Sequence, residues 1–175
     1  MSRTPLIPTI IATGLGSGFA PKAPGTAGAI LATIMWFVAS YLLEPTTLVC
    51  TTLAAIVIAT IIGTWTTNKL MPYWGEDPSK VVIDEMIGVW IPLLVSPAMS
   101  VEYALLSLFL FRFFDILKPL GIRALDKKHG AFWVMADDIL AGIYSLFIVL
   151  IIRWIIKRGL FHNLLRHKYL LLAHQ

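Results

Sequence analysis

Five acidic residues lie in apolar stretches of this sequence, where an ionised carboxylate is costly. The stretches are VVIDEMIGVW, FLFRFFDILKP and VMADDILAG, and the acids are Asp84, Glu85, Asp115, Asp137 and Asp138. A charge at mid-membrane costs roughly 2.5–3.5 kcal/mol or more, so such residues are usually paired, inward-facing and functional. We expect the three stretches to meet in one site. The alternative for each stretch is a carboxylate that reaches the interface at a helix end.

Several carboxylates in one place oppose one another's ionisation unless a cation neutralises them. A hard divalent cation does this, and a few protein oxygens supplemented by water and phosphate are typical ligands of Mg²⁺. Adjacent acids on a helix point about 100° apart, so one of each pair can bind metal while the other orients ligand or water. The acidic stretches therefore predict a magnesium site.

The stretch RFFDILK adds two cations at helical spacing. Arg112, Asp115 and Lys118 are three residues apart and span an arc of about 120° on one helix. Asp115 can pair with either cation, or face the metal while Arg112 and Lys118 bind an anion. The alternative is a salt-bridged helix end.

A glycine-rich stretch, GLGSGFAPKAPGTAGA, covers residues 14–29 and contains Lys22 and Thr26. It leads into a predicted helix, and exposed N–H groups at a helix N-terminus suit a phosphate. The glycine spacing matches neither a P-loop nor a dinucleotide fingerprint. Close packing of membrane helices is the other use of such glycines.

The composition indicates an all-α, multi-pass membrane protein. The 175 residues are 58% hydrophobic and 14% charged, with a mean hydropathy of +0.80, whereas soluble domains carry about 25% charged residues. This length suits a single domain. The net charge of +4 is not arranged with aromatic residues as in a nucleic-acid groove, so we expect no nucleic-acid partner. Cys50 is the only cysteine, which excludes an internal disulfide and a thiolate metal site.

The hydropathy pattern predicts about four to five transmembrane helices. The expected segments are 28–43, with Thr26 as its cap, then 48–65, 81–95, 103–118 and 132–152. Residues 69–80 are expected to form a polar loop, and residues 121–130 a basic surface loop. A basic tail follows at 153–175.

Threading five crossings from a cytoplasmic N-terminus places all five acids on the cytoplasmic side. Nine of the fourteen Lys and Arg residues fall on that side, in agreement with the positive-inside rule, and the other five begin at Arg153. The tail does not fit this pattern. It either lies in the membrane plane or follows a segment that does not cross fully.

With these residues in view, the sequence resembles the phosphatidylglycerophosphatase A family. Four segments in family order carry the resemblance: GSGFAPKAPGTAGA, VIDEMIGVW, FRFFDILKPLGI and MADDILAG, within a motif-bearing core at 14–142. The resemblance implies one membrane-embedded phosphatase domain in the bacterial inner membrane. It also implies a magnesium-dependent enzyme that converts phosphatidylglycerophosphate to phosphatidylglycerol and inorganic phosphate.

The resemblance and the charges together imply roles for the site residues. The expected metal ligands are Asp84, Glu85, Asp137 and Asp138; the catalytic residues are Asp115, Lys118 and Asp138; and the phosphate ligands are Lys22, Thr26, Arg112 and Lys118. Water would attack phosphorus in line, or an aspartyl-phosphate would form. The alternative function is a small cation transporter or channel that uses the carboxylates. The expected partners are the phospholipid substrate and the bilayer, and no oligomeric state is predicted.

Overall fold

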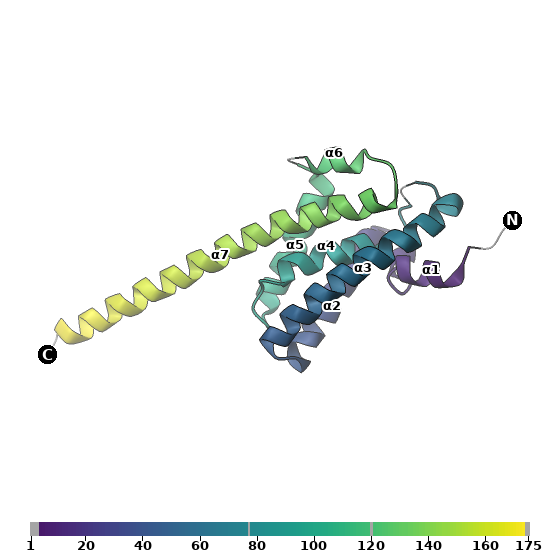
Figure 1. The fold of residues 1–175 in the computed structure, drawn as a ribbon. Coiled ribbons are helices and arrows are strands. Elements are labelled where there is room, and N and C mark those ends of the chain that lie inside the picture. The colour runs from purple at the N-terminus through teal and green to yellow at the C-terminus, as the bar shows by residue number, and fades with distance from the viewer. Residues whose placement is uncertain (1–3, 77, 120, 174–175) are drawn as a thin grey trace.

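The computed structural model describes residues 4–76, 78–119 and 121–173, with side chains up to Gly159. These residues form helices and no strand, which confirms the all-α prediction. In chain order the elements are α1 (Leu6–Ala12), the 3-10 helix η1 (Ser17–Phe19), α2 (Pro24–Leu42), α3 (Pro45–Trp74), α4 (Ile83–Leu93), α5 (Val101–Leu117), α6 (Ile122–Asp126) and α7 (Ala131–Ala173). Figure 1 shows α2 to α5 gathered beside the first half of α7, whose second half extends alone.

Among the described residues, three helices are long and apolar enough to cross a membrane: α2, α3 and the part of α7 at Ala131–Gly159. The membrane prediction is therefore confirmed, whereas the number of four to five crossings is approximate. The α4 helix has 11 residues and is about 16 Å long, roughly half of the hydrocarbon thickness. It runs antiparallel to α5, which has 17 residues. Both helices are shorter than the three that are long enough to span.

The short α4 helix is the centre of the bundle. It packs against α2, α3, α5 and α7, and most of its side chains are buried. Met86, Val89 and Leu93 share one apolar cluster with residues of α2 and α5. Ile83 and Ile87 share a second cluster with residues of α1, α3 and α7. A short helix of this kind can lie at membrane depth because protein surrounds it.

Two polar contacts connect the chain that leaves α4 to α5 and α7. The Ser96 and Ser107 hydroxyls share a hydrogen bond of 2.9 Å between the turn and α5. The Arg153 guanidinium of α7 donates to the Val95 carbonyl. A backbone that turns within hydrocarbon needs such partners, because lipid supplies none.

The outer faces of the bundle are apolar. Leu42 of α2, Ile61 of α3, Phe109 of α5 and Phe147 of α7 are each more than half exposed. In a soluble protein, contiguous apolar surface of this kind would drive association. On these helices it is the expected lipid-facing surface.

Three expectations about the helices and loops were wrong, and the last helix is longer than its expected span. Thr26 does not cap α2, because the helix already begins at Pro24, a residue whose fixed φ suits a first helical position. The α3 helix continues to Trp74, so half of the expected 69–80 loop is helical. The basic loop contains α6. The tail continues α7 without a break to Ala173, and its side chains beyond Gly159 lie outside the described residues.

Candidate active site

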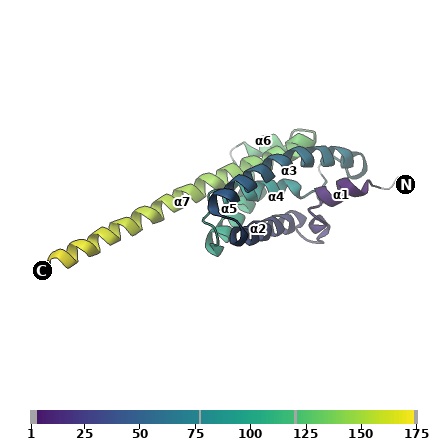
Figure 2. The same cartoon turned by 60° about the horizontal axis from the view of Figure 1, so that its bottom comes forward.

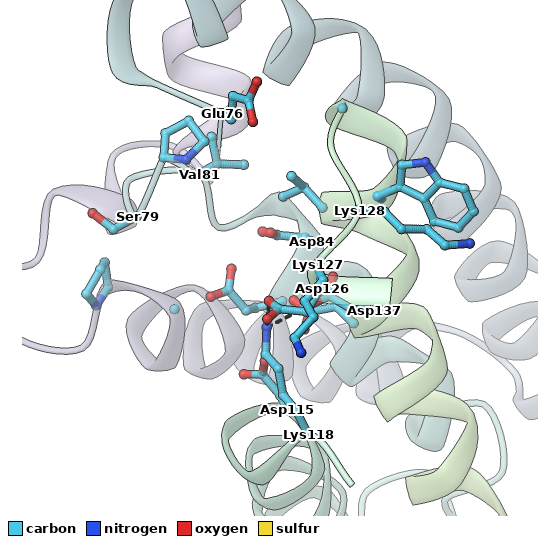
Figure 3. Close-up of a pocket in the computed structure, with 18 of the residues that line it drawn as sticks. Glu76, Ser79, Val81, Asp84, Asp115, Lys118, Asp126, Lys127, Lys128 and Asp137 are labelled. Carbon is cyan, nitrogen blue, oxygen red and sulfur yellow. Dashed lines mark hydrogen bonds and ion pairs between the residues drawn. The ribbon is translucent and has the colours of Figure 1, made fainter. Parts of the chain in front are cut away.

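A cavity of about 480 Å³ lies at one end of the bundle. At this end α2, α4 and α7 begin, and α3 and α5 finish (Figure 2). Its lining includes all five predicted acids: Asp84, Glu85, Asp115, Asp137 and Asp138. The close-up shows Asp84, Asp115 and Asp137 reaching one space from three different helices (Figure 3). The expected convergence of the three acidic stretches is therefore confirmed.

Three of the acids form a compact carboxylate cluster. Asp84, Glu85 and Asp138 each place one oxygen so that all three atoms lie within 4.8 Å of one another. Asp84 and Asp138 are buried. Asp84 Oδ1 and Glu85 Oε2 are buried and lack a hydrogen-bond partner among the described residues. Buried carboxylate oxygens without donors are costly, and a hard cation such as Mg²⁺ would satisfy them. The cluster therefore fits a magnesium ion.

Two glycines bring α4 and α7 close enough to form the cluster. A Cβ added to Gly142 would lie 2.4 Å from the Gly88 carbonyl oxygen, and one added to Gly88 would lie 2.9 Å from the Asp138 carbonyl oxygen. Pro92 lacks the N–H that would normally bond to the Gly88 carbonyl. That carbonyl faces Gly142 instead, in the kind of backbone contact that recurs between close helices.

The glycine-rich stretch has a similar structural use at Gly25. A Cβ added there would lie 1.8 Å from Glu85 Oε1 and 3.2 Å from Arg112 Nη1. Because Gly25 has no side chain, the first turn of α2 can contact the carboxylate cluster. The N-terminal end of α2 therefore faces the Glu85 carboxylate.

Arg112 is positioned by the helical spacing that the sequence indicated. Its Nη1 donates to Asp115 Oδ2, three residues later on α5, and lies 3.8 Å from Glu85 Oε1 on α4. One guanidinium thus balances a carboxylate from each helix. This contact joins the α5 acid to the cluster.

Lys118 joins two other acids at the end of α5. Its backbone is left-handed, with φ 46°, and Pro119 follows it. Lys118 Nζ donates to Asp137 Oδ2 at 2.8 Å and also to Asp126 of α6. Partial burial alone would lower the pKa of Lys118, but the two carboxylates outweigh it and raise the pKa above its usual range. Lys118 therefore stays positively charged at neutral pH.

The cavity also contains ionisable residues that were not predicted to belong to the site, among them Asp126, Glu76 and His129. Glu76 lies in the stretch predicted as a polar loop and Asp126 and His129 in the one predicted as a basic surface loop, yet all three line the cavity. Glu76 and His129 pair across its mouth, from the chain that follows α3 and the chain that precedes α7. Asp126 is the only acid in the basic 121–130 segment. This isolated acid was the one feature of the sequence that could have indicated its place in the site. The contacts themselves depend on how α6 folds back.

Lys22 and Thr26 are not among the described residues that line the cavity. Lys22 is exposed and comes directly before the lining residues Ala23, Pro24 and Gly25. Thr26 lies in the first turn of α2. Their assignment to phosphate binding stays a prediction, as do the roles of the acids and cations inside the cavity.

Asp126 is expected to act as a positioning residue for Lys118. We predict that Asp126→Asn lowers kcat for phosphate release about tenfold, within the range seen for outer-shell partners, and that Asp126→Glu restores most of it. The free energy of unfolding should change by less than about 1 kcal/mol, because partly exposed ion pairs contribute little. Steady-state kinetics and denaturant unfolding measure the two effects. Glu44→Gln, an exposed acid at the start of α3, is the control, and an equal loss there would contradict the role.

The fold and the cavity define a helical membrane protein with an acidic centre at one end of the bundle. The Phosphatidylglycerophosphatase A family matches residues 10–153. The chain belongs to this family, and it is a phosphoric monoester hydrolase.

Three bacterial relatives support this assignment. A Bacteroides thetaiotaomicron protein, named provisionally as a phosphatidylinositol-3-phosphatase, is 51% identical over 89% of this chain and 99% of its own length. The phosphatidylglycerophosphatase A of Haemophilus influenzae is 36% identical over 83% of this chain and 88% of its own. The phosphatidylglycerophosphatase A of Escherichia coli is 33% identical over 78% of this chain and 77% of its own length. No solved structure gives a significant match. The transporter alternative finds no support.

Proposed function

We propose that this enzyme hydrolyses the terminal phosphate monoester of phosphatidylglycerophosphate, with Mg²⁺, to phosphatidylglycerol and inorganic phosphate. The observation that supports it most is the buried cluster of Asp84, Glu85 and Asp138, whose oxygens lie within 4.8 Å beside two cations. Family membership gives the class of reaction. The cavity supplies the charges that such a reaction needs.

Asp84, Glu85 and Asp138 would hold the ion in this proposal. Asp137 is the fourth predicted ligand, and its Oδ2 accepts a hydrogen bond from Lys118. A bound Mg²⁺ would neutralise the carboxylates and polarise a phosphoryl oxygen. Few protein ligands are typical for this ion, which keeps several positions for water and phosphate.

The remaining residues of the cavity would orient the phosphate and manage its charge. Lys118 and Arg112 are fixed cations, each held by two carboxylates, and a dianionic phosphate would lie between them and the cluster. Preorganised charges of this kind stabilise a transition state without reorganisation. Monoester hydrolysis is among the slowest uncatalysed reactions, so a strong electrostatic site is needed.

Asp115 is the group best placed to receive a proton from the attacking water. Its Oδ2 is occupied by Arg112, which leaves Oδ1 for the water. The new bond joins the water oxygen to phosphorus, and the bond from phosphorus to the glycerol oxygen breaks. That oxygen leaves as an alcohol after it takes up a proton from solvent, and Asp115 returns to solvent the proton that it received. A positioned carboxylate contributes typically 10²–10⁴-fold to such transfers.

The cavity end is proposed to face the cytoplasm of the inner membrane. Lys127 and Lys128 line its mouth, whereas the turns at the opposite end, at 43–44 and 94–100, carry no Lys or Arg. Basic residues concentrate on the cytoplasmic side of membrane proteins. The substrate phosphate would then reach the cavity at headgroup level.

Phosphatidylinositol 3-phosphate is a second candidate substrate. The relative that is 51% identical carries this substrate in its provisional name. In both lipids the headgroup alcohol carries a phosphate monoester, so the carboxylate cluster suits either. The two lipids differ in that alcohol, which is the linear glycerol in phosphatidylglycerophosphate and the inositol ring in phosphatidylinositol 3-phosphate.

Phosphate release by the purified protein tests the proposal and separates the two substrates. We expect phosphatidylglycerophosphate to be hydrolysed with Mg²⁺, activity to disappear in EDTA, and excess Mg²⁺ to restore it, because the cluster loses its counter-charge without a cation. Phosphatidylinositol 3-phosphate is assayed in parallel at equal surface concentration. Unchanged release in EDTA would refute the metal mechanism. A higher kcat/KM for the inositol lipid would replace the proposed substrate.

A further inference from the structure

A shallow groove of about 400 Å³ lies beside the active-site cavity, between α3 and the start of α7. We call it the tail groove. Its lining includes Ile61, Thr64, Trp65 and Asn68 of α3, with Phe132 and Trp133 of α7. Ile61, Trp65 and Phe132 are each at least half exposed. The groove therefore opens on the outer, lipid-facing side of the bundle.

The tail groove adjoins the cavity. His129, Gly130 and Trp133 line both hollows. Lys128, which lines the cavity, places its Nζ 3.8 Å from the centre of the Trp133 ring. A molecule in the groove thus needs to pass only the His129–Trp133 edge to reach the cations of the cavity.

The polarity of the groove changes along its length. Asn68 and His129 are polar and lie toward the cavity end, while Ile61 is seven residues from Asn68 and about 10 Å further along α3. Aromatic side chains between them match the residues found at the membrane interface. A polar end beside an anion cavity and an apolar end toward the membrane match the two parts of a phospholipid.

We propose that the tail groove holds one acyl chain of the lipid substrate while its headgroup occupies the cavity. This inference rests on the proposed function and adds the path by which the lipid reaches the site. Acyl chains are already in an apolar solvent, so the groove gains little hydrophobic energy. Its effect is to fix where the chain descends and so to orient the phosphate, since small misplacements reduce rates strongly.

A bulky residue in the groove tests the proposal. In Thr64→Trp the indole would fill the groove, and the lost hydroxyl bonds only to the Thr60 carbonyl of its own helix, at 2.7 Å. The assay compares dioleoyl and dihexanoyl forms of phosphatidylglycerophosphate. We expect the kcat/KM for the dioleoyl form, divided by that for the dihexanoyl form, to be about tenfold lower in the variant than in the wild type. Leu105→Trp, on the exposed face of α5, should leave the ratio unchanged.

Crosslinking gives a second readout that does not need turnover. A phosphatidylglycerol with a diazirine in one acyl chain should label the peptide containing residues 61–68 in the wild type, and less of it in Thr64→Trp. An unchanged kcat/KM ratio, or an equal loss with both chain lengths, would overturn the proposal. So would labelling confined to other helices, or a change in oligomer size in Thr64→Trp, which would mark the groove as a subunit interface. A wild type that is labelled here but releases no phosphate would instead refute the proposed function.

Discussion

Asp138→Asn is expected to abolish phosphate release without lowering the stability of the protein. The side chain is 4% exposed and lies with Asp84 and Glu85 in the carboxylate cluster. Losing one ligand should reduce activity at least about a hundredfold, since even outer partners of metal ligands cost 10–100-fold. Without metal, the change removes one of three neighbouring carboxyl groups that oppose one another's ionisation, and less repulsion favours the folded state. Phosphate release and thermal unfolding in detergent measure the two quantities.

Magnesium should stabilise the wild type but not the Asp138→Asn variant. A ligand at a hundred times its Kd adds about 2.7 kcal/mol to the free energy of unfolding, and this gain should disappear with the ligand. Glu102→Gln is the control, because that carboxyl is fully exposed at the start of α5 and should retain both activity and the magnesium effect. A variant that still hydrolyses substrate within a few fold of the wild type would remove Asp138 from the site.

The second large effect is expected at Gly142, which contacts no substrate. In Gly142→Ala the new methyl would lie 2.4 Å from the Gly88 carbonyl oxygen and 2.9 Å from Ile91 Cδ1. Overpacking of this kind costs typically 1–3 kcal/mol. The α4 and α7 helices must move apart, which separates Asp84 and Glu85 from Asp138. We predict a lower unfolding temperature together with a fall in activity of about a hundredfold, since small misplacements at a site are that costly.

Gly159→Ala is the matched control on the same helix. Nothing lies within 4 Å of a Cβ added at Gly159, so the only expected effect is the better helix propensity of alanine, up to about 1 kcal/mol of stabilisation. Activity should not change. If Gly142→Ala behaves like Gly159→Ala, the close approach of the two helices does not position the acids.

The convergence of the acids could be predicted because it follows from short-range rules. When consecutive helices run in alternating directions, every second loop lies at the same end of the bundle. The acids lie near the loops of one end. The pairing of Arg112 with Asp115 follows from their spacing on one helix. Charged residues are rare in the apolar segments of a membrane protein, so these few acids and cations were the candidates for the site.

Contacts that depend on chain reversal outside the helices could not be predicted. Asp126 reaches Lys118 only because α6 folds back over the end of α5. Glu76 pairs with His129 across 53 positions of sequence. The helix start was misplaced for a different reason: threonine is a good cap, but Pro24 begins the helix two residues earlier. Local propensity does not decide between two adjacent starts.

The short length of α4 has a consequence for the charges of the membrane topology. A helix that stops partway through the bilayer leaves a partial negative charge at its C-terminal end, and the guanidinium of Arg153 binds the chain just beyond that end, at Val95. The exposed Arg153 side chain is therefore a counter-charge to the C-terminal end of α4. It should be left out when basic residues are counted to decide which side of the membrane the long final helix ends on.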